Sequence, residues 1–128
     1  MKMPSLNTAF KSMPLVVLES PYGGNVERNL KYARLCIKDC IRRGEAPIAS
    51  HLLFTQPNIL DDNIPEERTT GMNAGFAWNR HADIIVVYSD FGVSSGMETG
   101  IQVASLLGKP IVFRKLPDDL MAMMKQKV

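Results

Sequence analysis

The sequence is short of the residues that usually mark metal and redox sites, with two cysteines and two histidines among 128 residues. Cys36 and Cys40 lie four residues apart in a helical pattern, without the second ligand pair that a structural zinc site needs. We therefore expect them to be small core residues, and we expect no metal and no cofactor. His51 follows a predicted strand with no second histidine beside it, and such a histidine is more often structural than catalytic.

Charge of one sign and long apolar runs are scarce as well. The formal net charge is +2 and the Lys and Arg residues are scattered, which argues against a nucleic-acid footprint. No apolar run approaches membrane-spanning length, and the N-terminus lacks the apolar core of a signal peptide. We expect a cytoplasmic protein that binds neither nucleic acid nor membrane. The length suits one domain, predicted over residues 14–128 behind a flexible lead-in at residues 1–13.

Short apolar runs alternate with helical patterns along the chain. Strands are predicted at residues 15–18, 47–50, 84–88 and 110–113. Helices are predicted to follow Asn25, Asn63, Ser95 and Pro117. The first helix is expected to bury a face made of Val26, Leu30, Ala33, Ile37 and Ile41. The alternation predicts an α/β fold, a flavodoxin-like doubly wound sheet of four or five parallel strands.

Two loops should border the switch point of this sheet, which falls between strands 15–18 and 84–88. They are residues 20–24 and 90–96, the loops richest in glycine and serine. The second precedes a helix, whose N–H groups and positive end suit a phosphate. Arg28 could reach an anion, although an exposed ion pair is its commoner fate. The predicted ligand-binding residues are Ser20, Pro21, Tyr22, Gly23, Gly24, Arg28, Ser94, Ser95, Gly96 and Met97.

Two acidic residues of the second loop and its helix each allow two interpretations. Glu98 stands three residues after Ser95, so the pair reads as a capping box in which the carboxylate folds back onto the backbone. Alternatively Glu98 faces the crevice and acts as a catalytic carboxylate on a sugar carbon. Asp90 is either a second polar anchor, which would bond a sugar hydroxyl or help protonate the leaving base in catalysis, or a turn residue that tethers the loop. The segment 55–63 is a polar excursion, long enough for a lid or rim loop.

The segment Gly96-Met97-Glu98-Thr99-Gly100, with Gly108-Lys109-Pro110 after it, resembles the active-site helix of the nucleoside 2-deoxyribosyltransferases. It is also similar to the 2′-deoxynucleoside 5′-phosphate N-hydrolases. The resemblance implies that Glu98 is the nucleophile toward the anomeric carbon and that Ser94 and Ser95 bind the 5′-phosphate. It departs at Met97, where those enzymes have an aromatic residue.

The chain from Leu15 to Arg114 resembles, more closely, a group of small proteins of bacteriophages and bacteria. The shared features are Ser20-Pro21-Tyr22, Glu27-Arg28-Asn29, Pro65-Glu66-Glu67-Arg68, Ala77-Trp78 and Ser95-Gly96-Met97. That likeness names no activity. We expect a protein that binds a nucleotide or nucleoside and cleaves or transfers at its N-glycosidic bond. The alternatives are a non-catalytic protein that sequesters a nucleotide signal, possible for a phage-encoded relative, and a flavin-binding module.

A homo-oligomer is also expected, most simply a dimer built on the helix at residues 65–81. Gly71 and Gly75 lie four residues apart and leave a smooth stripe for close backbone approach. Phe76 and Trp78 could anchor the contact. The resemblance implies the same, since the related enzymes complete their pockets across subunits.

Overall fold

Four apolar segments form one parallel sheet in the order β2-β1-β3-β4. They are β1 (Leu15–Glu19), β2 (Ala46–Ile48), β3 (Ile84–Tyr88) and β4 (Ile111–Arg114). Each neighbouring pair runs parallel. The order confirms the predicted flavodoxin-like, doubly wound α/β fold, whose switch point lies between β1 and β3.

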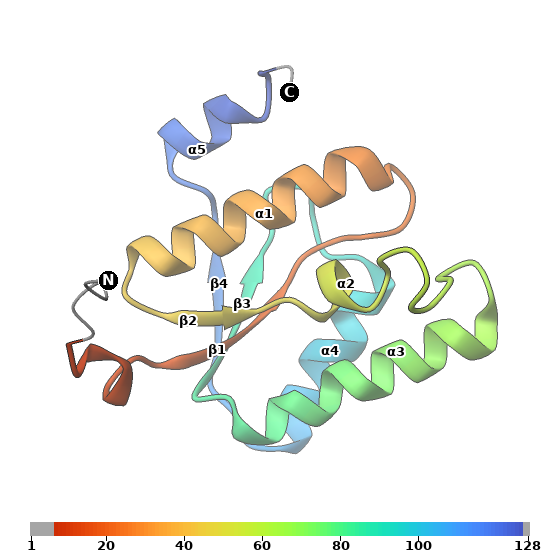
Figure 1. Cartoon of the computed structure of the whole chain (residues 1–128), viewed down its shortest axis with the longest axis horizontal. Coiled ribbons are helices and arrows are strands. Elements are labelled where there is room, and N and C mark those ends of the chain that lie inside the picture. The colour runs from red at the N-terminus through yellow and green to blue at the C-terminus, as the bar shows by residue number, and fades with distance from the viewer. Residues whose placement is uncertain (1–6, 127–128) are drawn as a thin grey trace, which may run out of the picture.

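The structure, a computed structural model, describes residues 7–126. Helices cover both faces of the sheet (Figure 1). One face carries α1 (Val26–Arg42) and α5 (Asp118–Met123), and the other carries α3 (Pro65–Trp78) and α4 (Ser95–Leu106). Three short elements complete the fold: η1 (Ala9–Lys11), α2 (Ser50–Leu53) and η2 (Asn79–His81). The predicted lead-in therefore contains the 3₁₀ turn η1, and its first six residues lie outside the described part.

Alternate side chains of the central strands feed two separate cores, as expected for a strand with both faces covered. Under α1 the larger core contains Val16, Leu18, Tyr32, Leu35, Cys36, Cys40, Val86, Tyr88, Leu116 and Leu120. Against α4 a smaller core contains Val17, Ala82, Ile85, Ala104 and Ile111. Both cysteines are free and buried, which confirms their predicted place in the core.

Several local predictions hold and others need correction. Asn25 caps α1 by accepting a hydrogen bond from the Arg28 N–H at 3.1 Å. Asn63 was the wrong cap for α3, because the residue before Pro65 is Ile64, which is extended and makes no side-chain cap. The second strand ends at Ile48, two residues early, because Ser50 already opens α2.

The buried side of α1 also differs from the predicted apolar stripe. It consists of Asn29, Tyr32, Ala33, Leu35, Cys36, Asp39 and Cys40. Ile41 is 59% exposed. The polar members of this face are buried because they find partners inside the fold: the Asn29 amide donates to the carbonyls of Tyr22 and Gly23 at 2.9 Å each. This bond holds the turn after β1 against α1.

The glycine stripe of α3 packs inside the chain. A side chain at Gly75 would overlap Ser50 of α2, and one at Gly71 would touch Leu60. The close approach predicted from these glycines is therefore made by α2 and the following loop, so the stripe gives no support to a dimer. Trp78, at the end of α3, is 49% exposed. None of the described helices has the length and apolar character to cross a membrane.

Candidate functional site

A cavity of about 300 Å³ opens between the carboxyl end of β1 and the start of α4, the helix that follows β3, on the edge where doubly wound sheets bind ligands. Its walls come from the turn after β1, from α2 and the loop that follows it, from α3 and from the start of α4. The lining residues with polar side chains are Glu19, Ser20, Tyr22, Ser50, His51, Thr55, Asp62, Glu67, Arg68, Ser94 and Ser95. Apolar surface is supplied by Phe54, Leu60, Met72, Phe76 and Met97.

The N-terminus of α4 forms one wall of this cavity. Ser94 is the cap, and its hydroxyl accepts a hydrogen bond from the Met97 N–H at 3.3 Å. The predicted capping box of Ser95 and Glu98 is therefore wrong by one residue. The helix itself offers no partner to the N–H groups of Ser95 and Gly96, its first two residues. These two groups are the donors that an anion in the cavity would meet.

Arg68 of α3 brings a positive charge to the same wall. A side-chain carbon at Gly96 would lie 3.4 Å from the Arg68 Nη2, so the guanidinium stands over the first turn of α4. Arg68 also lies 3.8 Å from the Asp62 carboxylate on the rim, and its side chain is 46% exposed. Because so exposed an ion pair is weak, the guanidinium remains able to bind a ligand.

Glu19, the last residue of β1, places a carboxyl group deeper in the cavity wall. Its side chain lies against Gly100, where a Cβ atom would overlap the carboxyl group. Among the described residues, Glu19 Oε2 and Asn79 Oδ1 are the buried side-chain oxygens without a hydrogen-bond partner. Burial raises the pKa of the Glu19 carboxyl from 4.5 to about 8, so Glu19 is mostly protonated at neutral pH.

Ser20 and His51 form a hydrogen-bonded pair beside Glu19. The Ser20 Oγ lies 2.7 Å from the His51 Nε2. Burial lowers the pKa of His51 from 6.5 to about 4, so its imidazole is neutral at pH 7. A neutral imidazole can accept the Ser20 proton at Nε2 while Nδ1 carries its own. The interior of the cavity thus holds an acid and a base that are both uncharged at neutral pH.

The structure gathers seven of the predicted site residues around the cavity: Ser20, Tyr22, Gly23, Ser94, Ser95, Gly96 and Met97. Gly24 lines an adjoining hollow beneath the loop at residues 55–63, which forms the rim as predicted. Pro21 is buried and does not line the cavity. Arg28 points elsewhere, with its guanidinium 4.2 Å from the centre of the Phe91 ring.

The two predicted catalytic acids lie outside the cavity lining. Glu98 is exposed on α4, whose buried side carries Met97, Gly100 and Ala104. Asp90 tethers its loop, because its Oδ2 accepts hydrogen bonds from the Tyr32 hydroxyl and, at 3.0 Å, from the Leu116 N–H. The tethering interpretation of Asp90 therefore describes its contacts. The carboxyl groups that line the cavity are those of Glu19, Asp62 and Glu67, and only that of Glu19 is a buried one without a hydrogen-bond partner among the described residues.

Three important residues of the site were missed from the sequence. Glu19 reads as the end of a strand, His51 as an isolated histidine and Arg68 as one of many surface arginines. The polar excursion at residues 55–63 was the available signal, since a rim loop indicates that the residues on both sides of it face a pocket.

Within residues 7–126 no cluster of three His, Cys, Asp or Glu side chains could hold a metal ion.

The fold and cavity define a flavodoxin-like α/β protein with a ligand site at the switch point of its sheet. Residues 14–114 match the family described as a domain of unknown function, DUF7768, and the chain belongs to that family. The match spans all four strands and the whole cavity wall. No curated protein matches the chain.

Proposed function

We propose that the cavity binds a nucleoside 5′-monophosphate and that the protein cleaves or transfers at the N-glycosidic bond. The observation that carries this proposal is one cavity with two different ends. One end has the N–H groups of α4 and the Arg68 guanidinium, which suit a phosphate. The other end has the unpaired Glu19 carboxyl beside Ser20 and His51.

The spacing of these ends supports a pentose between them. Gly96 lies at the phosphate end and Gly100, against which Glu19 packs, lies one helical turn further along α4. The four residues from Gly96 to Gly100 span about 6 Å of helix axis, which is comparable to the length of a pentose. Glu19 would then meet the anomeric centre, and Tyr22, Phe54 and Phe76 would wall the base.

A second function is favoured by the position of Glu98. The related enzymes use the matching glutamate as nucleophile, whereas here Glu98 is exposed and outside the cavity lining. A protein that binds and sequesters a nucleotide signal, as a phage-encoded relative could, needs the cavity and no nucleophile. Release of free base separates the two functions.

A cytoplasmic location and a homo-oligomer stay predictions. The mass of the protein measured by light scattering tests the homo-oligomer.

The test is a panel of nucleoside 5′-monophosphates and matching nucleosides, measured by thermal shift, calorimetry and free-base release. Nucleotides should stabilise the protein more than nucleosides do, by mass action on the folded state. Arg68→Met should remove that preference and weaken nucleotide affinity by roughly 10–100-fold, the scale of one charge-assisted hydrogen bond.

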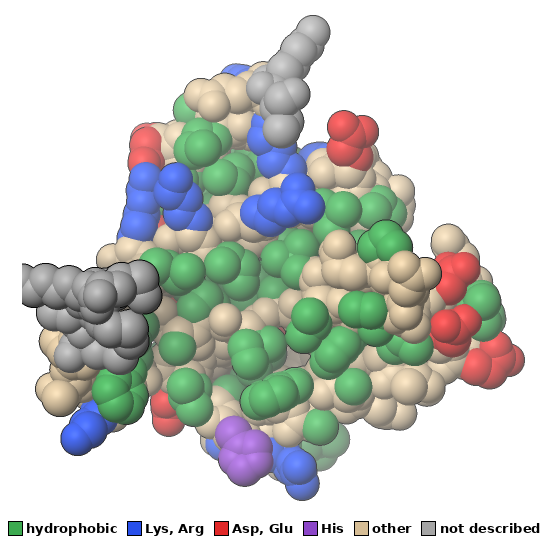
Figure 2. Space-filling view, in the orientation of Figure 1, with side chains coloured by type: hydrophobic (Ala, Val, Ile, Leu, Met, Phe, Trp, Pro, Cys, Tyr) green, Lys and Arg blue, Asp and Glu red, His purple; other side chains and the backbone are tan. Residues whose placement is uncertain are grey.

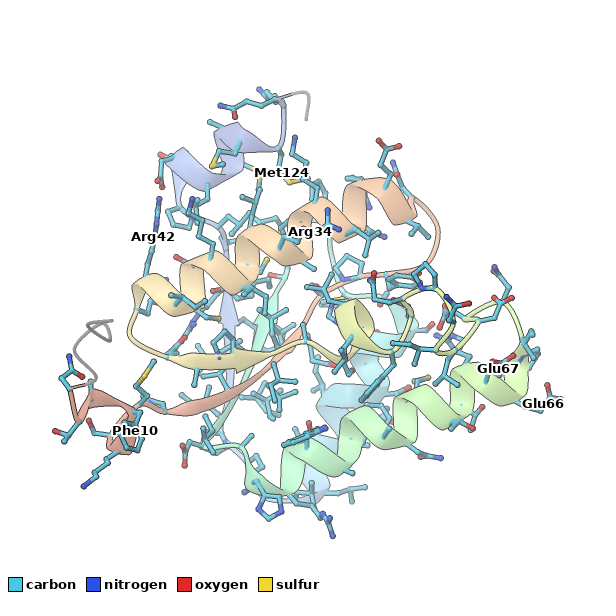
Figure 3. The ribbon with its side chains drawn as sticks, viewed as in Figure 1. Phe10, Arg34, Arg42, Glu66, Glu67 and Met124 are labelled. Atoms are coloured by element: carbon cyan, nitrogen blue, oxygen red, sulfur yellow. The ribbon has the colours of Figure 1, made fainter. Side chains whose placement is uncertain are left out.

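Arg34→Met provides the matched control, since Arg34 lies on α1 away from the cavity (Figure 3). It should leave the affinity unchanged. Equal stabilisation by nucleosides and nucleotides, with no effect of Arg68→Met, would contradict the proposed phosphate site.

A further inference from the structure

Glu19 and His51 meet in one cavity from different elements. Glu19 ends β1 and packs against α4, whereas His51 belongs to α2 and bonds to Ser20. The Glu19 carboxyl lies against Gly100 of α4, whereas Ser20 is bonded to His51 of α2, so the acid and the pair reach the cavity from different walls. An acid on one side of a sugar and a base on the other is the arrangement that hydrolysis by direct water attack needs.

We propose, on the basis of the proposed function, that Glu19 is the general acid of this site and that the Ser20–His51 pair is its general base. The C1′–N bond breaks, its electron pair passes to the base nitrogen, and that nitrogen takes the proton of the Glu19 carboxyl. Water bonds to C1′ and gives its proton to Ser20 Oγ, while the Ser20 hydroxyl proton passes to His51 Nε2. The products are free base and the sugar phosphate, and the extra proton on His51 returns to Glu19 through solvent.

The ionisation of the two groups agrees with these roles, although its order is the reverse of the usual one. Glutamate ordinarily loses its proton before histidine does. Here burial raises the pKa of Glu19 to about 8 and lowers that of His51 to about 4. Between these values the glutamate carries a proton to give and the histidine can accept one.

Other charged groups near the cavity lie toward its rim. They are Arg68 and Glu67 of α3 and Asp62 of the loop before it. The acid of the first turn of α4, Glu98, is exposed and does not line the cavity. Acidic side chains gather at the outer end of α3 in Figure 2, and Figure 3 places Glu66 and Glu67 there. The raised pKa of Glu19 comes from its burial.

The test measures free-base release from nucleoside 5′-monophosphates between roughly pH 3.5 and 9.5. This range begins below the pKa of His51, about 4, and ends above that of Glu19, about 8. The wild type should show a plateau of kcat with limbs near 4 and 8. Glu19→Gln, which keeps the shape of the protonated acid, should lower kcat by roughly 10²–10⁴-fold with little change in KM and should lose the alkaline limb. His51→Gln should lose the acid limb. Glu66→Gln, on the exposed outer end of α3, is the matched control and should behave as the wild type.

The remaining outcomes distinguish failure of the acid–base pair from failure of the proposed function. Base release by the wild type that survives Glu19→Gln within threefold, with its alkaline limb kept, overturns the acid–base pair and leaves the proposed function standing. Calorimetric binding of nucleotides without any base release overturns the pair and the glycosidic activity together, and supports the sequestering protein. Absence of both binding and release overturns the proposed function itself.

Discussion

Beneath α1, both carboxylate oxygens of Glu45 are bound by Arg114, whereas on the face covered by α3 and α4 one oxygen of Glu19 has no partner. The Arg114 contacts are 2.7 and 2.6 Å long, and they lower the pKa of Glu45. Nearby, the Tyr88 hydroxyl donates to Asp39 at 2.6 Å. The fold therefore satisfies buried acids where they only connect elements.

The unpaired glutamate is exceptional by that standard. A buried polar group without a partner costs free energy, so its retention calls for an explanation. Glu19 differs from Glu45 in one further respect, which is that its side chain lines a cavity. The comparison identifies Glu45 as a structural acid and supports the proposal that Glu19 acts on a ligand.

The largest expected effect on stability comes from breaking the ion pair between Arg114 and Glu45. Arg114→Met leaves Glu45 buried and unpaired, which should lower the free energy of unfolding by roughly 3–5 kcal/mol. Urea denaturation at pH 7 measures this change. The double variant Glu45→Gln with Arg114→Met should recover much of the loss, because the uncompensated charge is gone. A loss below about 1 kcal/mol in the single variant would show that the pair is not the buried contact described here.

Glu19 and Glu45 should also make the free energy of unfolding depend on pH in opposite directions. Glu45 has a lowered pKa when folded, so its contribution is lost as pH falls below about 4.5. The pKa of Glu19 is raised to about 8 when folded, so the folded state holds a proton that the unfolded state releases above 4.5. Its contribution is complete below pH 4.5, is lost as pH rises toward 8, and then stays constant.

Glu19→Gln should remove this decline, which is at most about 1.4 kcal/mol per pH unit. The measurement is the free energy of unfolding at pH values from 4.5 to 9 for the wild type and the variant. The two proteins should be equally stable at the acid end, and the variant should be the more stable one at the alkaline end. Parallel curves across this range would contradict the raised pKa.

Much of the fold and part of the site were predictable from the sequence. β-Branched runs such as Ile84–Tyr88 gave the strands, and serine and glycine after them gave the cavity wall. The role of Glu98 was not predictable, because two serines in succession can each cap the helix. The cap is Ser94, so Met97 takes the place in the capping box that Glu98 would have with Ser95 as the cap. Glu19 was missed because its environment depends on Gly100, which is remote in sequence. No local pattern shows that a distant glycine leaves room for a carboxyl group.

The smallest expected effects test whether Ser94 is the cap of α4 and whether Glu98 is an exposed residue without a catalytic role. Ser94→Ala removes the cap and should cost roughly 0.5–2 kcal/mol of stability. Glu98→Gln should change stability by less than about 0.5 kcal/mol, as is usual for an exposed side chain, and should keep any base release. Thermal and urea unfolding of both variants provide the comparison. Full loss of base release in Glu98→Gln would restore Glu98 as the nucleophile.

The most direct measurement is a carbon-13 NMR titration of the glutamate side-chain carboxyls, with Glu19→Gln and Glu45→Gln used to assign the two signals. The account predicts that Glu19 titrates with a midpoint near 8 and that Glu45 titrates below 4.5. The added nucleotide that the cavity binds should move the Glu19 signal and leave the Glu45 signal in place. A Glu19 midpoint near 4.5, unmoved by nucleotide, would contradict the claim that this glutamate is an unpaired acid held for a ligand.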